Sequence, residues 1–438
     1  MTCNTFCPIP WNFQAVRSNG DMRVCCQANV TANKGVLRKT DGTPYNAAID
    51  SMDDSRNSEL MKIMRTNMLN GIWSTECQRC QTEESSGLRS RRQYETAYWA
   101  DLTVDSVIPY TTADGTIDTT SLPVQYYDLR FGNLCNLSCR MCGPQDSTGW
   151  YDDWHAMTGQ TYFDDTHGRE EIYKQNGKLV SDSYSWHDSN LFWEQIANNT
   201  KNVQHVYMAG GEPLLIERHY EFLERCIDTG SAENMIIEYN TNMTSVPARV
   251  LNLWRKFKKV KIGASIDGFG KILEYQRYPA KWDKVLANIH KIDKEPNNIQ
   301  PWFAFTVTAY NVLHLPDFMR WKLEDSGLEK FNSTKMQPIV THHVAHRPLY
   351  LNVRVLPLDI KMLVRDKFDR LHAWLESENY PTNVIKQSDQ IRSSICDYMF
   401  SADMHATHWK QFLAFTTKLD KIRDEDISTI IPELGPWL

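Results

Sequence analysis

The sequence predicts an α/β fold in which strands and helices alternate along most of the chain. From residue 124 onward, short runs rich in β-branched and aromatic residues recur, and polar turn residues separate them from their neighbours. Each run but the first is followed by a segment with the 3.6-residue apolar period of an amphipathic helix. Repeated β–α units are typical of a parallel sheet with helices outside it, which is either open or curved into a barrel.

Six strands and the helices around them are expected in this region. The strand-like runs cover residues 124–131, 203–208, 235–240, 260–266, 302–308 and 351–356. The helical segments cover residues 216–228, 247–257, 282–292, 315–322 and 359–375. Residues 143–200 are too many for a short βα connection, so they are expected to form an insertion. This insertion is interpreted either as a lid or substrate wall, or as a surface excursion with its own aromatic core.

The first hundred residues predict a small cysteine-rich domain. A strand at 11–17, a Ser-Asn-Gly turn and a second strand ending in Cys25-Cys26 indicate a hairpin. A helix at 57–69 and the pair Cys77-x-x-Cys80 follow. The predicted domains are residues 1–100, a linker at 101–123, a core at 124–357 and a helical extension at 358–438.

One detail of the extension is also predicted. Asp420 and Arg423 are spaced as an i,i+3 pair on a helix, and they are expected to be solvated.

Composition limits the class of protein. The 438 residues are enough for about two or three domains. The net charge of −6 gives no sign of a nucleic-acid-binding surface. No apolar run approaches the ~20 residues of a membrane span, and no leader begins the chain, so a soluble cytoplasmic protein is expected. Nine of the 11 cysteines lie before residue 143, which favours metal or redox chemistry over disulfides in that compartment.

Three cysteines directly follow the first core strand. Cys135, Cys139 and Cys142 have the spacing C-x3-C-x2-C, and thiolates are the ligands that iron–sulfur clusters take. A cubane has four irons, so three protein ligands leave one iron open to a substrate or cofactor. A zinc site is the alternative, but it usually closes with four ligands, and no partner pair follows Cys142 closely.

This spacing resembles the signature of the radical S-adenosylmethionine (SAM) superfamily. The resemblance implies a partial (β/α)6 barrel, a [4Fe-4S] cluster on the three cysteines, and SAM chelated to the open iron. It also implies that one electron from an external reductant, such as a flavodoxin or ferredoxin, cleaves SAM to a 5′-deoxyadenosyl radical that abstracts hydrogen from an unreactive C–H bond.

Polar residues at later strand ends extend the resemblance. Gly210-Gly211-Glu212 ends the second strand and is similar to the family's GGE motif, which holds the SAM amino group. Further SAM contacts that the resemblance implies are Asn242, Ser265, Asp267 and Arg277. Met141 departs from the family pattern because an aromatic residue usually stands there, although a thioether can fill the same apolar role.

The amino-terminal cysteines resemble the auxiliary-cluster domains called SPASM or twitch, which usually follow the barrel. The resemblance implies a second [4Fe-4S] cluster on Cys7, Cys77, Cys80 and one of Cys25 and Cys26. Neighbours on a strand face opposite ways, so one of that pair is expected to point at the cluster, and Cys25 is favoured. Cys3 is an alternative to Cys7, and zinc on the same ligands is an alternative to the cluster.

The predicted function is radical SAM catalysis, most consistent with modification of a peptide or protein substrate. A small-molecule or nucleotide substrate is the alternative within the family. A zinc- or cluster-binding interaction protein without catalysis is the alternative outside it.

Overall fold

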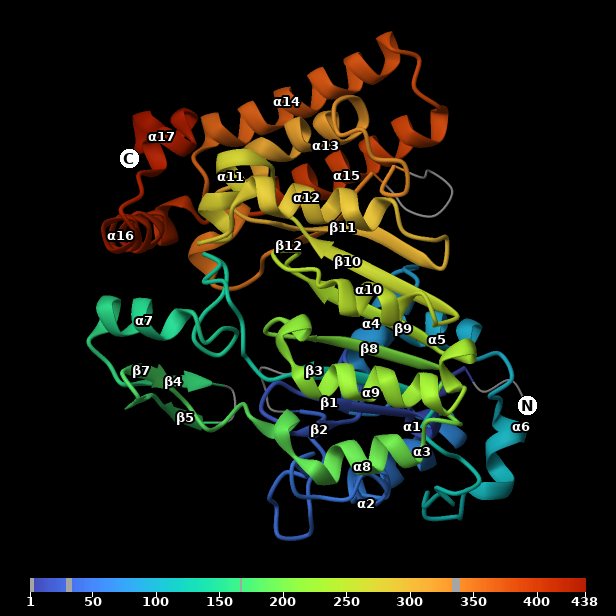
Figure 1. Cartoon of the computed structure of the whole chain (residues 1–438). Coiled ribbons are helices and arrows are strands. Elements are labelled where there is room, and N and C mark those ends of the chain that lie inside the picture. Colours follow the sequence, from blue (N-terminus) through green and yellow to red (C-terminus); the bar gives the residue numbers. More distant parts are fainter. Residues whose placement is uncertain (1–3, 29–33, 166–167, 333–338) are drawn as a thin grey trace. The chain divides into compact units, whose positions relative to one another are not determined.

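The computed structural model describes residues 4–28, 34–165, 168–332 and 339–438. Within these residues the fold is α/β, with a mostly parallel sheet of eight strands and two small antiparallel sheets (Figure 1). The chain forms two compact units. The first consists of Met1–Leu134, Tyr162–Tyr239 and Asn252–Val260, and the second of Cys135–Thr161, Asn240–Leu251 and Lys261–Leu438.

The sheet of the first unit joins amino-terminal strands to strands of the predicted core. Its strand order is β9-β8-β3-β1-β2, in which β2 is antiparallel and the other neighbours are parallel. The strands are β1 (Phe13–Val16), β2 (Met22–Arg23), β3 (Tyr126–Phe131), β8 (His205–Gly210) and β9 (Ile236–Thr241). The domain boundaries predicted at residues 100 and 124 are not tested by this strand order and stay predictions.

One face of this sheet is apolar and covered by helices. Along β3, Leu129 and Phe131 are buried on this face. The ring of Trp193, from α8 (Asn190–Asn198), lies 5.7 Å from that of Phe131. From α9 (Glu217–Asp228), the His219 Nε2 atom lies 3.0 Å from the Tyr239 hydroxyl. The alternate residues of the strands therefore face the other way, and they include aromatic and charged side chains.

Short helices and hairpins complete the first unit. The helices are α1 (Ile9–Asn12), α2 (Met52–Arg56), α3 (Glu59–Leu69), α4 (Gln78–Ser85), α5 (Arg91–Tyr98) and α6 (Val104–Val107). Arg65 on α3 is fully buried and donates to the carbonyls of Pro10 and Gly115, at 3.0 and 2.7 Å. The predicted insertion forms two hairpins here, β4 (Tyr162–Asp165) with β5 (Gly168–Glu171) and β6 (Tyr173–Gln175) with β7 (Lys178–Val180).

The second unit has the strand order β12-β11-β10, with helices after the strands. The strands are β10 (Lys259–Ser265), β11 (Ile299–Val307) and β12 (Thr341–Val344). The helices of this part of the chain are α7 (Trp150–Thr158), α10 (Ala248–Trp254), α11 (Gly270–Gln276), α12 (Trp282–Asp293), α13 (Leu315–Glu324), α14 (Leu358–Ser377), α15 (Thr382–Phe400), α16 (His405–Arg423) and α17 (Ile427–Ile430). Both β9 and β10 contain residues of each unit.

The sixth strand predicted at 351–356 is wrong. Those residues form two short 3-10 helices, Leu349–Leu351 and Val353–Val355. Val353 and Val355 are buried as a strand residue would be, but the Asn352 side chain accepts the Arg354 N–H at 3.0 Å and turns the backbone. The sixth core strand is instead β12, which is not among the strands predicted from the sequence and pairs in parallel with β11.

The histidines in and after β12 take part in ordinary side-chain contacts. His342 Nε2 lies 3.2 Å from the Ser394 hydroxyl, and His346 Nδ1 lies 3.0 Å from the Tyr398 hydroxyl. Within the ranges given above, no helix combines the length and apolar character needed to cross a bilayer.

A buried lysine on α13 gives this unit a pH-dependent stability. Lys322 is 2% exposed, its Nζ donates to the Ile339 carbonyl, and it lies 5.3 Å from the centre of the Phe303 ring. Burial lowers the pKa of Lys322 to about 7 from its ordinary value of 10.5. Between these two pH values the unfolded chain binds one more proton than the folded chain, so the free energy of unfolding rises with pH.

We expect Lys322→Met to remove this dependence. From pH 7 to 9, the wild-type free energy of unfolding should rise relative to that of the variant by up to about 1.4 kcal/mol per pH unit. Urea denaturation of both proteins across this range measures the difference. Parallel pH profiles for the two proteins would contradict the expectation.

Candidate functional site

The cysteine loop that follows β3 begins the second unit. Cys139 is buried, whereas Cys135 and Cys142 are partly exposed. The loop backbone is hydrogen-bonded to the end of α11: Ser138 N–H donates to the Tyr278 carbonyl at 2.6 Å, and Arg140 N–H to the Gln276 carbonyl at 2.8 Å. The three thiols are therefore presented by a loop whose backbone is fixed from one side.

Two side chains from later parts of the chain, one after a strand and one after a helix, reach the cysteine sulfurs. Asn242, just after β9, places its Nδ2 atom 3.8 Å from Cys135 Sγ and 2.9 Å from Asn136 Oδ1. Arg277, just after α11, places its Nη1 atom 3.9 Å from Cys139 Sγ. Both are donors aimed at sulfur, and such donors stabilise thiolates and tune iron–sulfur clusters.

An ion pair orients Arg277. Its Nη2 atom lies 2.6 Å from Asp267 Oδ2, and the Asp267 side chain is fully buried. Asp267 Oδ1 accepts the Thr306 N–H at 2.6 Å, and Asn311 donates to the Asp267 carbonyl at 3.1 Å. Ser265, two residues earlier, ends β10 and is partly exposed.

Electrostatics favour a thiolate at Cys139. The hydrogen bond from Cys142 lowers the pKa of Cys139, and Arg277 and Arg423 add to this against the opposing effect of burial. The same hydrogen bond, with burial, raises the pKa of Cys142 well above its usual value. Burial alone would lower the pKa of Arg277, but Asp267 raises it above its ordinary value.

The Gly210-Gly211-Glu212 turn lies in the first unit and is bonded to the segment that precedes the cysteine loop. Gly211 N–H donates to the Gly132 carbonyl at 3.1 Å, and Glu212 N–H to the Leu134 carbonyl at 2.8 Å. The Glu212 side chain is 3% exposed and accepts the Leu214 N–H at 3.2 Å. This turn thus fixes the backbone immediately before Cys135.

Only glycine fits the two positions of this turn. Gly210 has φ +126°, and a Cβ there would lie 2.6 Å from Phe131 N. A Cβ on Gly211 would lie 2.2 Å from the Leu134 carbonyl oxygen.

We expect Gly210→Ala and Gly211→Ala each to lower the free energy of unfolding by roughly 2–4 kcal/mol. Gly435→Ala is the control, because its Cβ would meet nothing within 4 Å. Urea denaturation checks this, and equal effects at all three positions would refute it.

The carboxyl-terminal extension holds the cysteine loop, which the sequence did not predict. The Arg140 side chain is fully buried and pairs with Asp420 of α16 and, at 2.7 Å, with Glu425. Arg423 donates to the Ser138 carbonyl at 2.7 Å and pairs with Asp153 of α7 at 2.7 Å.

The predicted solvated pair of Asp420 and Arg423 is therefore wrong. Each residue is 7% exposed, and each binds the cysteine loop rather than the other.

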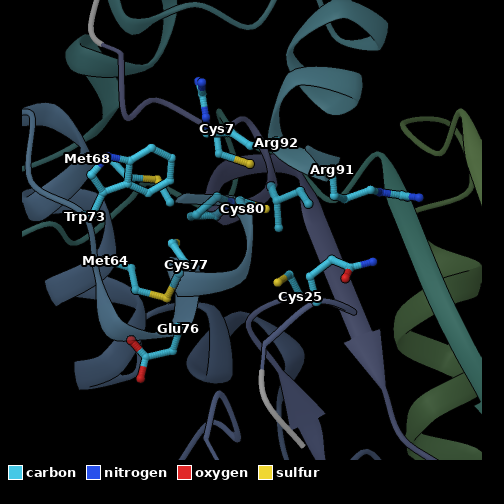
Figure 2. A pocket seen from close by; sticks show the side chains of 13 residues that line it. Cys7, Cys25, Met64, Met68, Trp73, Glu76, Cys77, Cys80, Arg91 and Arg92 are labelled. Carbon is cyan, nitrogen blue, oxygen red and sulfur yellow. The ribbon is translucent and has the colours of Figure 1, made fainter. Parts of the chain in front are cut away.

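Four amino-terminal cysteines line one pocket of the first unit. Cys7, Cys25, Cys77 and Cys80 surround it together with Met64, Met68, Trp73, Arg91 and Arg92 (Figure 2). Cys77 caps α4 and Cys80 lies one helical turn later. Cys26 is not among the residues that line this pocket, and Cys3 lies outside the described residues.

Burial and mutual repulsion disfavour free thiolates in this pocket. Burial raises the pKa of Cys7 well above its usual value, with contributions from Cys25 and Cys77. Burial also raises the pKa of Cys25 and of Cys77 to about 12. A cationic iron core would relieve this repulsion, so the donor set fits a cluster. Across the described ranges, no group of three or more His, Cys, Asp or Glu is arranged to hold one metal ion.

Residues 129–298 match the family model described as the Radical SAM superfamily. This segment is therefore similar to a radical SAM domain. Proteins of that superfamily use a [4Fe-4S] cluster and SAM. The matched segment includes the cysteine loop, the Gly210–Glu212 turn, and the residues Asn242, Asp267 and Arg277.

Several solved structures have a partial structural similarity to this chain. Native anSMEcpe with bound AdoMet has a TM-score of 0.38 and 16% identity, over 58% of this chain and 62% of that one. SuiB of Streptococcus suis, bound to the precursor peptide SuiA, has a TM-score of 0.28 and 12% identity, over 70% of this chain and 60% of that one. The chain thus spans less than two thirds of each. No curated protein sequence matches it.

Proposed function

We propose that the protein is a radical SAM enzyme that modifies a peptide or protein substrate. Cys135, Cys139 and Cys142 would ligate the [4Fe-4S] cluster and leave one iron for SAM. The observation that carries this proposal is the convergence of Asn242 and Arg277 on the sulfurs of Cys135 and Cys139, at 3.8 and 3.9 Å. When bound, the cluster supplies one-electron cleavage of SAM and, through it, abstraction of hydrogen from a C–H bond.

The chain's own residues bind and orient SAM in this proposal. The backbone of Gly210 and Gly211 and the carboxylate of Glu212 would hold the SAM amino group. Arg277 is a candidate for the SAM carboxylate, because its Nε atom is buried and has no hydrogen-bond partner among the described residues. Ser265 and Asn242 offer short polar side chains for the remaining polar groups of SAM.

We further propose a second [4Fe-4S] cluster on Cys7, Cys25, Cys77 and Cys80. Four thiolates saturate a cubane, so this cluster would transfer electrons rather than bind substrate. Its shell of Met64, Met68 and Trp73 would limit water access, and Arg91 and Arg92, paired with Glu95 and Glu84, line the same pocket. We also propose that the core is a partial (β/α)6 barrel and that the substrates are peptides.

Anaerobic reconstitution with iron and sulfide tests the proposal. We expect a brown protein with about eight irons per chain. It should form 5′-deoxyadenosine when SAM and a one-electron reductant such as flavodoxin are added. Addition of SAM should also change the electron paramagnetic resonance spectrum of one cluster and leave that of the other unchanged. A colourless protein that holds zinc and forms no 5′-deoxyadenosine would overturn the proposal and favour a non-catalytic binding module.

A further inference from the structure

A row of charged side chains crosses the sheet of the first unit, and the proposed function does not use it. In the strand register, Ala15 lies opposite both Arg23 on β2 and Asp128 on β3. Asp128 lies opposite Tyr207 on β8, and Tyr207 opposite Glu238 on β9. Directly opposed residues point to the same face of a sheet, so these side chains share the face that α8 and α9 do not cover.

The side chains on this face change from aromatic to charged along the direction of the parallel strands. Two residues before the charged row, Phe13, Tyr126 and His205 form an aromatic layer, with ring centres 4.9 Å apart for the first pair and 4.6 Å for the second. Two residues after the row, Arg130 lies opposite Ala209. The charged groups thus lie toward the carboxyl ends of β3 and β8, which is the end where parallel α/β sheets bind their ligands.

Arg130 is held in place and yet remains accessible. Its Nε atom donates to Asp128 Oδ1 at 2.9 Å, and its guanidinium lies 4.7 Å from the centre of the Tyr207 ring. The side chain of Arg130 is 38% exposed, whereas that of Asp128 is 6% exposed. Its Nη1 atom also donates to the Tyr207 hydroxyl at 3.5 Å. The protein therefore orients the guanidinium, and the exposed part of the group can meet a ligand at little entropic cost.

The accessible charge of this cluster is positive, which favours an anionic ligand. The cluster holds two arginines, Arg23 and Arg130, and two carboxylates, but the side chain of Arg130 is more exposed, at 38%, than those of Asp128 and Glu238, at 6% and 21%. Arg23 donates to the Ala28 carbonyl at 2.7 Å, and its buried Nε atom has no hydrogen-bond partner among the described residues. Glu238 lies 3.2 Å from His205. Arginine binds carboxylates through paired N–H donors.

We propose that Arg130, oriented by Asp128 and Tyr207, binds a carboxylate group of the peptide substrate. The inference rests on the proposed function for its substrate class. Ala209, opposite Arg130, directly precedes the Gly210–Glu212 turn, so the bound carboxylate would anchor the peptide beside the residues proposed to hold SAM. The carboxylate comes from an acidic side chain or from a peptide carboxyl terminus.

Protection from arginine modification tests this site in the full-length protein. Phenylglyoxal adducts would be mapped by mass spectrometry in the presence of N-acetylaspartate amide, N-acetylalanine or neutral N-acetylasparagine amide, at constant ionic strength. At least one of the two acids should slow modification of Arg130 by about threefold or more, and the neutral amide should not. Protection by the first acid alone assigns a side-chain carboxylate, and protection by the second alone assigns a terminal carboxylate.

Arg169 is the internal reference because its side chain is 57% exposed and lies in the same unit. Its rate of modification should not change. No protection of Arg130 by either acid, or equal protection by the neutral amide, would overturn the inference.

A matched pair of variants gives a second measurement. The thermal shift that the protecting acid produces should disappear in Arg130→Gln and persist in Arg169→Gln. A shift retained in both would refute the site, and should Arg130→Gln not fold, the wild-type modification rates still decide. Neither measurement needs the iron–sulfur cluster or SAM, so a negative result leaves the proposed radical chemistry standing, and failure of reconstitution leaves this binding result standing.

Discussion

Replacing Cys139 by serine is expected to abolish SAM cleavage while leaving the amino-terminal cluster in place. Iron content should fall from about eight to about four per chain, because each cubane binds as a unit. Formation of 5′-deoxyadenosine should fall on the order of 10³-fold or more. The physical reason is that Cys139 is the buried member of the three cysteines, and its thiolate is the one stabilised by Arg277.

The matched control is Cys226→Ala, which removes a fully buried thiol on α9 that lies outside both cysteine groups. Its iron content and SAM cleavage should match the wild type. The reciprocal variant, Cys77→Ser, should lose the other half of the iron and keep the SAM-induced spectral change. If Cys139→Ser retained both its iron and its SAM cleavage, the assignment of the cluster to the loop after β3 would be wrong.

Replacing Asp420 by alanine is expected to be the most destabilising change in the second unit. Asp420 accepts hydrogen bonds from Arg140, from the Tyr275 hydroxyl at 2.8 Å and from the Ile427 N–H at 3.0 Å. Its removal leaves the buried Arg140 guanidinium with Glu425 as its remaining carboxylate. Losing one partner of a buried ion pair costs about 3–5 kcal/mol, because the other charge stays out of water.

Urea denaturation monitored by tryptophan fluorescence measures this loss. Asp366→Ala on α14 is the control, since that carboxylate is exposed and its removal should change stability by less than about 0.5 kcal/mol. The double variant Arg140→Met with Asp420→Ala should recover part of the lost stability, because no unpaired charge is then buried. Equal stabilities of Asp420→Ala and Asp366→Ala would contradict the burial of this pair.

Local sequence pattern was sufficient where an element is stabilised by its own residues. The runs that became β3, β8, β9, β10 and β11 combine β-branched and aromatic residues with a buried face, and the helices after them show a clear apolar stripe. The Gly210–Glu212 turn was singled out by its motif, whereas the close approach of Phe131 and Leu134 that requires the two glycines was not visible in the sequence.

Local pattern failed where partners come from distant parts of the chain. The polar β12 was not among the predicted strands, because pairing with β11 rather than its own apolar content makes it a strand. Asp420 and Arg423 have the spacing of an exposed helical pair, and their burial depends on Arg140 and Ser138, which lie 280 and 285 positions earlier. In the sequence, Asp128 and Arg130 are simply two polar residues on alternate positions of a strand. The register with β2, β8 and β9 is what places them in a cluster of charged side chains.

The distance along the chain between Arg140 and its partners has a consequence for biosynthesis. During translation the three thiols emerge from the ribosome long before residues 420–425 exist, so at that stage the loop lacks the ion pairs that bury Arg140. The nascent protein therefore passes through a period in which its proposed cluster ligands are presented on an incompletely anchored segment. Insertion of the proposed cluster into the anchored loop would consequently follow synthesis of α16.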